Sequence, residues 1–140
     1  MSELRPFHLA FPVDDLVYAR QWYVEVLGCE VCRESESSCV LNLFGHQIVA
    51  HKVDEMPEIA SSTVDCKLVP ASHFGCVLEW EHWHTLADKL KSRGIIFIIE
   101  PYIRYRGEPG EQATMFFRDP SGNNLEFKSF FDDSRIFRVS

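Results

Sequence analysis

The hydrophobic pattern of the first part of the chain changes from strand spacing to helix spacing and back. Residues 7–13 (FHLAFPV) alternate as a half-buried strand does. Apolar residues then recur at helical spacing over 16–27, after the capping candidates Asp14 and Asp15 and before Gly28, which suits a helix C-terminus. Three further strands are predicted near residues 30–33, 38–44 and 46–53.

The second part of the chain repeats this order. A strand over 73–80 precedes a helix face at 83–90, which ends before Gly94, and strands follow at 95–99, 113–117 and 124–130. His8 and His73 are 65 positions apart, and Gly28 and Gly94 are 66 apart. The pattern therefore predicts an α+β fold of two βαβββ modules, with eight strands in a curved mixed sheet around a cavity.

The expected organisation is a single domain, 1–140, built from two modules. The first module spans 6–53 and the second spans 71–131, with a C-terminal tail at 132–140. Residues 54–70 are mostly polar and include two prolines, so we expect them to form the linker between the modules.

Composition narrows the class of protein. Hydrophobic residues make up 46% of the 140 residues and charged residues 25%, which is typical of a globular chain. The formal net charge of -7 argues against nucleic acid as a partner. No apolar run approaches the roughly 18–20 residues that span a bilayer, and residues 1–6 lack a basic segment followed by an apolar one, so we expect a cytoplasmic protein without a membrane partner. In that compartment the five cysteines are expected to be reduced thiols.

Three polar residues occupy positions that suggest a metal site. His8 and His73 stand at equivalent places in the two modules, and Glu126 lies between Leu125 and Phe127 on the opposite face of a strand. Each alone would be read as a surface residue, but the repeat places all three on one side of a curved sheet. Two imidazoles and a carboxylate suit a divalent first-row metal and leave coordination positions open, whereas a closed structural zinc site normally uses four ligands.

The most specific segment is 117–127 (FRDPSGNNLEF), which resembles the signature of the vicinal-oxygen-chelate superfamily, also called glyoxalase/bleomycin resistance/dioxygenase. Residues 7–16 resemble its usual opening, and the resemblance extends to about Phe131. It implies paired βαβββ modules with His8, His73 and Glu126 as metal ligands. It also implies a homodimer and a small-molecule substrate that chelates through two neighbouring oxygens, with modules paired either within or between chains.

The resemblance leaves the reaction type open. Aligning Gly45 with Gly122 places Val49 opposite Glu126, and this favours the three-ligand set of extradiol ring-cleaving dioxygenases, with Fe(II) and with His51 as an acid/base. Phe116 departs from the tyrosine that those enzymes usually carry. The alternative is a glyoxalase or isomerase type that uses Zn(II), Ni(II) or Mn(II), with His51 or Gln47 as a fourth ligand.

Two further subgroups of the superfamily share this scaffold. The fosfomycin-modifying type also uses two histidines and a glutamate. It usually carries a threonine where this chain has Ala10, and it needs cations that Arg104, Arg106 and Arg118 would supply. A non-catalytic, resistance-type binding protein would typically lack the three ligands.

Overall fold

The computed structural model describes residues 4–65 and 67–139, which form two compact units. The first unit contains the chain up to Glu58 together with Asp119–Asn123, and the second contains the chain from Ile59 to Arg118 and from Asn124 onward.

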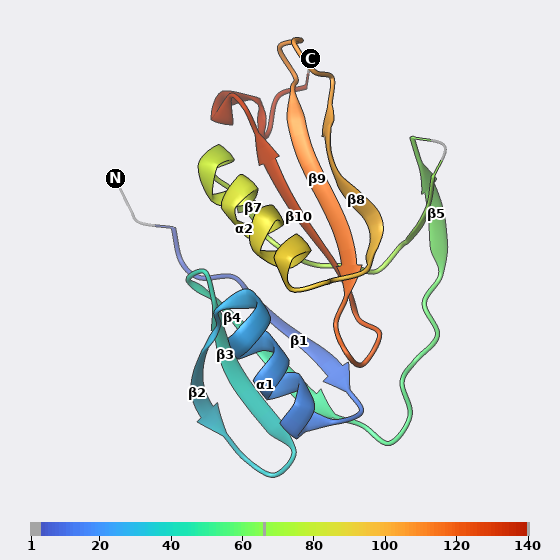
Figure 1. The fold of residues 1–140 in the computed structure, drawn as a ribbon. Coiled ribbons are helices and arrows are strands. Elements are labelled where there is room, and N and C mark those ends of the chain that lie inside the picture. Colours follow the sequence, from blue (N-terminus) through green and yellow to red (C-terminus); the bar gives the residue numbers. More distant parts are fainter. Residues whose placement is uncertain (1–3, 66, 140) are drawn as a thin grey trace. The chain divides into compact units, whose positions relative to one another are not determined.

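The first unit is a βαβββ module. Its sheet has the order β1-β4-β3-β2, in which β1 is parallel to β4 and the other neighbours are antiparallel. α1 packs on one face of this sheet (Figure 1). The elements are β1 (His8–Val13), α1 (Leu16–Leu27), β2 (Glu30–Glu34), β3 (Ser38–Leu43) and β4 (His46–Lys52).

Local chemistry explains where α1 begins and ends. The side chain of Asp15 accepts a hydrogen bond from the backbone N–H of Tyr18, and this satisfies one of the free donors at the helix start. Gly28 ends the helix with φ at 74°, a left-handed conformation that costs glycine little. The fully buried Tyr23 and Leu27 face the sheet, so the predicted amphipathic helix is confirmed.

The second unit repeats this arrangement. Its sheet has the order β7-β10-β9-β8, with β7 parallel to β10, and α2 lies across one face (Figure 1). The elements are β7 (Val77–Leu78), α2 (Trp80–Ser92), β8 (Phe97–Arg104), β9 (Gln112–Arg118) and β10 (Asn124–Phe130), followed by a short 3-10 helix at Asp133–Arg135.

Three features differ in detail from the sequence pattern. The hydrogen bonds divide the eight module strands between two four-stranded sheets. The strand expected over 73–80 is regular only at β7, although an isolated bridge pairs Phe74 with Leu125. β8 extends beyond the expected 95–99 and passes through Pro101. Proline is tolerated there because β8 is an edge strand with shifts in its register.

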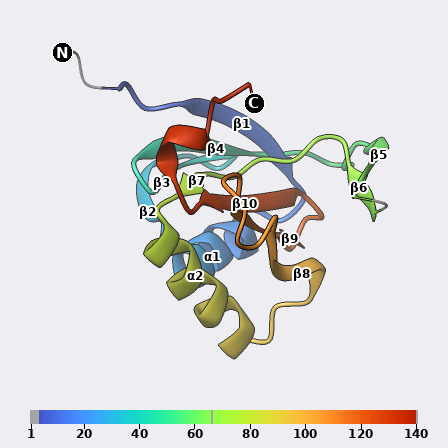
Figure 2. The ribbon, with the colours of Figure 1, turned by 90° about the horizontal axis from the view of Figure 1, so that it is seen from above.

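The segment 54–70 contains a two-stranded hairpin, β5 (Ser61–Val64) and β6 (Lys67–Pro70). The hairpin belongs to the second unit and lies on the other side of its sheet from α2 (Figure 2). Cys29, Cys32, Cys39 and Cys76 are not joined in disulfide bonds, whereas Cys66 lies outside the described residues. Within residues 4–65 and 67–139, no helix is long and apolar enough to cross a membrane.

Candidate metal site

Glu126 is placed by the alternation of side chains along β10. Its neighbours Leu125 and Phe127 are fully buried against the α2 side of the sheet. Glu126 points to the other face, where its side chain is 15% exposed. The alternation expected around Glu126 is therefore confirmed, and it leaves one carboxylate on the face that does not pack against the helix.

His73 lies beside this carboxylate. The Nε2 atom of His73 is 3.1 Å from Oε1 of Glu126. On the other side of the ring, Nδ1 is 2.8 Å from the backbone oxygen of Pro70. A carbonyl oxygen only accepts, so Nδ1 must be the donor in this bond, and the tautomer of a neutral His73 is fixed with its lone pair on Nε2. The ring also packs edge-on against Phe116, with centroids 4.8 Å apart.

This arrangement suits a bound cation. A neutral His73 directs the Nε2 lone pair at a carboxylate oxygen, and the contact becomes favourable only with a proton or a metal ion between them. The other carboxylate oxygen, Oε2, accepts a hydrogen bond from the buried hydroxyl of Thr114. Imidazole nitrogen and carboxylate oxygen are ordinary ligands of divalent first-row metals, and outer hydrogen bonds of this kind orient such ligands.

Thr114 and Pro70 were not identified from the sequence. Thr114 shared the predicted strand alternation with Phe116 but carried no metal-type group. The hydrogen bond that the Pro70 oxygen accepts from His73 depends on the backbone conformation after β6, which the hydrophobic pattern does not encode.

His8 lies in the first unit, at the start of β1. Its register partner in β4 is Gln47, and its Nδ1 is 2.7 Å from the side-chain oxygen of Gln47. His8 is thus held through Nδ1, as His73 is, and its Nε2 remains available as a ligand. The face opposite His8 carries the buried Phe11 and Val13, which agrees with the predicted orientation of the strand.

Strand register identifies the position equivalent to Glu126 in the first module. Leu9 pairs with Ile48 in the first unit, and Phe74 pairs with Leu125 in the second. The next residue is Val49 in one case and Glu126 in the other, which agrees with the alignment of the two glycine turns. Valine cannot bind a metal, so the equivalent position supplies no fourth ligand.

His51 lies further along the same strand as Val49. It is exposed and pairs with Pro12 and Ser38. Gln47, Val49 and His51 occupy alternate positions of β4, so their side chains share one face of the strand. His51 is therefore about 7 Å along the strand from Val49, and about 13 Å from Gln47, by the usual rise per residue.

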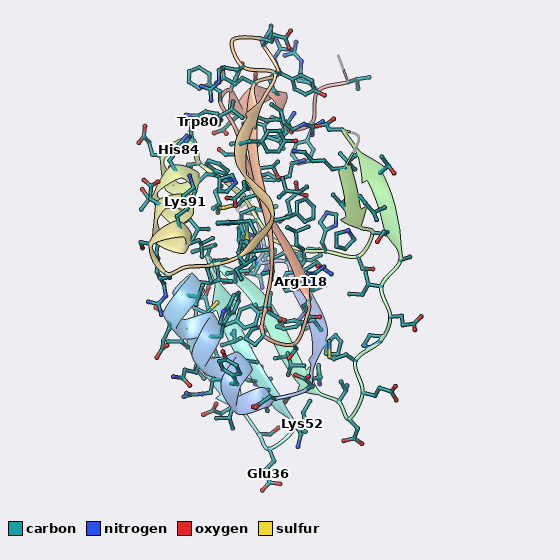
Figure 3. The ribbon with its side chains drawn as sticks, turned by 45° about the vertical axis from the view of Figure 1, so that its right-hand side comes forward. Glu36, Lys52, Trp80, His84, Lys91 and Arg118 are labelled. Carbon is teal, nitrogen blue, oxygen red and sulfur yellow. The ribbon has the colours of Figure 1, made fainter. Side chains whose placement is uncertain are left out.

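The structure brings His73 and Glu126 together in the second unit and places His8 and His51 in the first. Among residues 4–65 and 67–139, no three His, Cys, Asp or Glu side chains form a complete ligand group. His84, near the start of α2, does not join the pair formed by His73 and Glu126. The ring of His84 lies 5.0 Å from that of Trp80, and its Nδ1 is 2.9 Å from the Trp80 backbone oxygen (Figure 3).

Asp119, in the signature segment, has a structural role within the first unit. Its Oδ1 accepts the backbone N–H groups of Ser121 and Asn123, both at 2.9 Å, which closes a tight turn. Its Oδ2 accepts a hydrogen bond of 2.7 Å from the hydroxyl of the buried Tyr23. Burial raises the pKa of Asp119 although these hydrogen bonds lower it. This carboxylate is occupied by the turn and by α1, so it is not a candidate ligand.

The two modules and the signature turn define the class of the protein. The chain belongs to the Glyoxalase/Bleomycin resistance protein/Dioxygenase superfamily, whose family model matches residues 5–127. The predicted superfamily and its fold of paired βαβββ modules are thereby confirmed.

Solved structures give more particular similarities. A glyoxalase/bleomycin resistance protein/dioxygenase from Alicyclobacillus acidocaldarius is 36% identical, with a TM-score of 0.79 over 94% of this chain and 96% of that one. The fosfomycin resistance protein of Listeria monocytogenes is 18% identical, with a TM-score of 0.69 over 97% and 99%. Lactoylglutathione lyase from Agrobacterium tumefaciens is 16% identical, with a TM-score of 0.63 over 88% and 91%. The last two similarities establish the fold alone.

Proposed function

We propose that the protein is a metal-dependent enzyme in which His8, His73 and Glu126 bind one divalent cation. The observation that carries this proposal is the contact between Nε2 of His73 and Oε1 of Glu126. The hydrogen bond from Nδ1 of His73 to the Pro70 oxygen supports the proposal, because this bond leaves Nε2 available for a cation. His8 offers the same nitrogen in the same tautomer, held by Gln47.

The proposed ligand set favours an Fe(II)-dependent dioxygenase of the extradiol, ring-cleaving type. Val49 stands where the first module would supply a fourth ligand, so three protein ligands leave positions for a substrate and O2. When bound, the metal ion would act as a Lewis acid and a template for two neighbouring oxygens of a small substrate. A catechol is the simplest substrate of that description.

The roles of the surrounding residues follow from their contacts. Thr114 holds one oxygen of Glu126, so the other oxygen keeps a fixed orientation. Phe116, which is 4% exposed, packs on the ring of His73 and restricts its rotation. We propose His51 as the group that accepts or donates a substrate proton, because imidazole exchanges protons readily near neutral pH and His51 shares the Val49 face of β4. We also propose that the chain forms a homodimer, as the family resemblance implies.

The decisive experiment is an anaerobic titration of metal-stripped protein with Fe(II), Mn(II) and Zn(II). We expect one metal ion per chain in the wild type and loss of binding in Glu126→Ala. Glu100→Ala is a matched control, because it removes an exposed carboxylate from β8 of the same unit. Binding in the control and its loss in Glu126→Ala would justify oxygen-uptake assays with catechols, alongside thiol–aldehyde isomerase assays.

Other outcomes would change the assignment. Preference for Zn(II) or Mn(II) together with isomerase activity would support the glyoxalase-type alternative. Absence of metal binding, or binding that is indifferent to Glu126, would contradict the metalloenzyme proposal and leave a non-catalytic small-molecule-binding protein as the better account.

A further inference from the structure

A second polar cluster occupies the same sheet face as Glu126. In β8, Tyr102 pairs with Thr114 and Arg104 pairs with Gln112. Because Thr114 points to the Glu126 side of the sheet, its cross-strand partner Tyr102 does too, and so does Arg104 two residues later. The cluster and the proposed metal ligand therefore belong to one continuous surface of the second unit.

Arg104 and Tyr102 together hold one carboxylate, that of Asp65 at the end of the β5–β6 hairpin. Nη2 of Arg104 donates to Oδ1 of Asp65 at 2.9 Å, and Nε lies 2.6 Å from Oδ2. The hydroxyl of Tyr102 donates to Oδ2 at 3.1 Å. Nη2 of Arg104 also donates to the hydroxyl of Tyr105 at 3.2 Å, which fixes the guanidinium. This approaches the forked geometry by which arginine recognises carboxylates, with the Nη2 bond formed and Nε close to the second oxygen.

Asp65 is an imperfect occupant of this cluster. Its backbone has φ at 51°, a left-handed conformation that aspartate tolerates in a hairpin turn, and its side chain is 40% exposed. All of β5 is exposed, whereas Val69 in β6 is buried against Ile99 and Phe116, so Asp65 lies at the end of the hairpin away from this contact. The buried Nε of Arg104 makes no hydrogen bond within the described part of the chain, although Oδ2 of Asp65 is close, so the carboxylate is not aligned with this N–H.

We propose that Arg104 and Tyr102 form a carboxylate-binding site that Asp65 fills in the absence of ligand. The Arg104 side chain is only 18% exposed and needs an anionic partner, whereas the Asp65 side chain is 40% exposed and can rotate away while the buried Val69 keeps β6 in the core. A substrate carboxylate then replaces Asp65 and adds the bond to Nε.

This site specifies the substrate class of the proposed enzyme and rests on that proposed function. The substrate would carry a carboxylate in addition to its two neighbouring oxygens. Burial, followed by the hydrogen bond to Asp65, raises the pKa of Tyr102, and the charge of Glu126 raises it further. The Tyr102 hydroxyl therefore stays protonated at neutral pH as a donor. Tyr102 and Glu126 share one sheet face with β9 between their strands, which corresponds to roughly 10 Å by the usual strand spacing, so one molecule of modest size could span the two sites.

The test uses metal-free protein and simple probes. Binding of phenylacetate is followed through the backbone amide resonances of β8 in ¹⁵N NMR spectra, which every variant retains, with 2-phenylethanol as the neutral probe and phenylphosphonate as the competing anion. The variants are Asp65→Asn, which removes the negative charge bound to Arg104, and Arg104→Gln, which removes the guanidinium group. Arg106→Gln is the matched control, because it removes an exposed positive charge two residues away.

We expect Asp65→Asn to bind phenylacetate about tenfold more tightly than the wild type, and Arg104→Gln to bind it at least about tenfold more weakly. Equal affinity in Asp65→Asn and wild type, equal loss in the Arg106→Gln control, or tighter binding of phenylphosphonate or 2-phenylethanol would each overturn the proposal. Metal titration of the same variants separates the two ideas. Carboxylate binding without metal binding refutes only the proposed function, and metal binding without carboxylate binding refutes only this inference.

Discussion

Nε2 of His73 lies 3.1 Å from Oε1 of Glu126, although the two residues are far apart in the chain. The backbone explains this proximity. The N–H of Phe74 donates to the oxygen of Asn124, and the N–H of Glu126 donates to the oxygen of Phe74. These bonds set His73 one residue before the pairing with β10. The histidine is therefore positioned by the same parallel register that orients Glu126, and changes to that register should alter the site.

Thr114→Val should weaken metal binding without unfolding the protein. Valine has the shape of threonine but cannot donate to Oε2 of Glu126, so the carboxylate would lose its fixed orientation. Loss of such an outer hydrogen bond typically lowers metal affinity by about 10- to 100-fold. Competition titration with a chelator would measure this change. Thr114→Ser keeps the hydroxyl and should retain most of the affinity, and equal losses in both variants would show that the methyl group matters instead.

Gly75→Ala should destabilise the fold strongly. A Cβ at residue 75 would lie 1.7 Å from the backbone oxygen of Glu126, and a backbone atom cannot yield as a flexible side chain can. We expect a loss of about 3 kcal/mol or more in the free energy of unfolding, at the upper end of overpacking effects. Urea denaturation would measure it. Gly110→Ala is the control, because its Cβ would meet no atom within 4 Å, and it should change stability by less than about 1 kcal/mol.

Much of the fold could be predicted because it depends on local patterns. The alternation around Glu126 and the capping of α1 by Asp15 and Gly28 are short-range features, and the structure confirms them. The sequence pattern predicts too short a strand for β8, because Glu100 and Pro101 interrupt an apolar run. Only the position of β8 at the sheet edge, a long-range property, makes proline acceptable there.

The contacts around the candidate ligands could not be predicted in the same way. The Thr114 bond to Glu126 depends on which strands become neighbours, and the Asp65 bond to Arg104 depends on a hairpin whose strands are mostly exposed. Neither feature leaves a hydrophobic period in the sequence. The repeat identified His73 and Glu126, but the acceptor that fixes the tautomer of His73 is a backbone oxygen and has no side-chain signature.

Tyr23→Phe should reduce stability at neutral pH and alter its dependence on alkaline pH. The lost hydrogen bond from the buried hydroxyl to Asp119 should cost about 2 kcal/mol, as for other bonds to charged acceptors. Burial and Asp119 raise the pKa of Tyr23 well above 10.0. The unfolded chain therefore ionises this group first, and the stabilisation declines as pH rises above about 10.

Urea denaturation at pH 7 and pH 10.5 would test this prediction. The difference between wild type and Tyr23→Phe should shrink at the higher pH, whereas a constant difference would show that Tyr23 ionisation is not coupled to folding. Tyr18→Phe, which removes an exposed hydroxyl from the same helix, should change stability by less than about 0.5 kcal/mol at neutral pH.

Cys76 should react slowly with alkylating agents. Burial raises the pKa of its thiol to about 11, so only about a thousandth is thiolate at pH 8. Iodoacetamide labelling followed by peptide mass mapping should show the exposed Cys32 modified first. The rate at Cys76 should rise about tenfold per pH unit between pH 8 and 10. Modification of Cys76 as fast as Cys32 at pH 8 would mean that the segment beside β10 opens readily.

His51→Ala distinguishes the proposed acid/base from a fourth metal ligand. His51 pairs with Pro12, four positions beyond the pair of His8 and Gln47, which corresponds to about 13 Å along the strand. We therefore expect His51→Ala to bind metal as tightly as the wild type in calorimetric titrations. Gln47→Ala should bind it about tenfold more weakly, because His8 would lose the bond that orients its ring. A tenfold or greater loss in His51→Ala would instead favour four ligands and the glyoxalase-type reaction. The same titration thus distinguishes a three-ligand metal site, which leaves coordination positions for O2, from a four-ligand site whose reaction needs no O2.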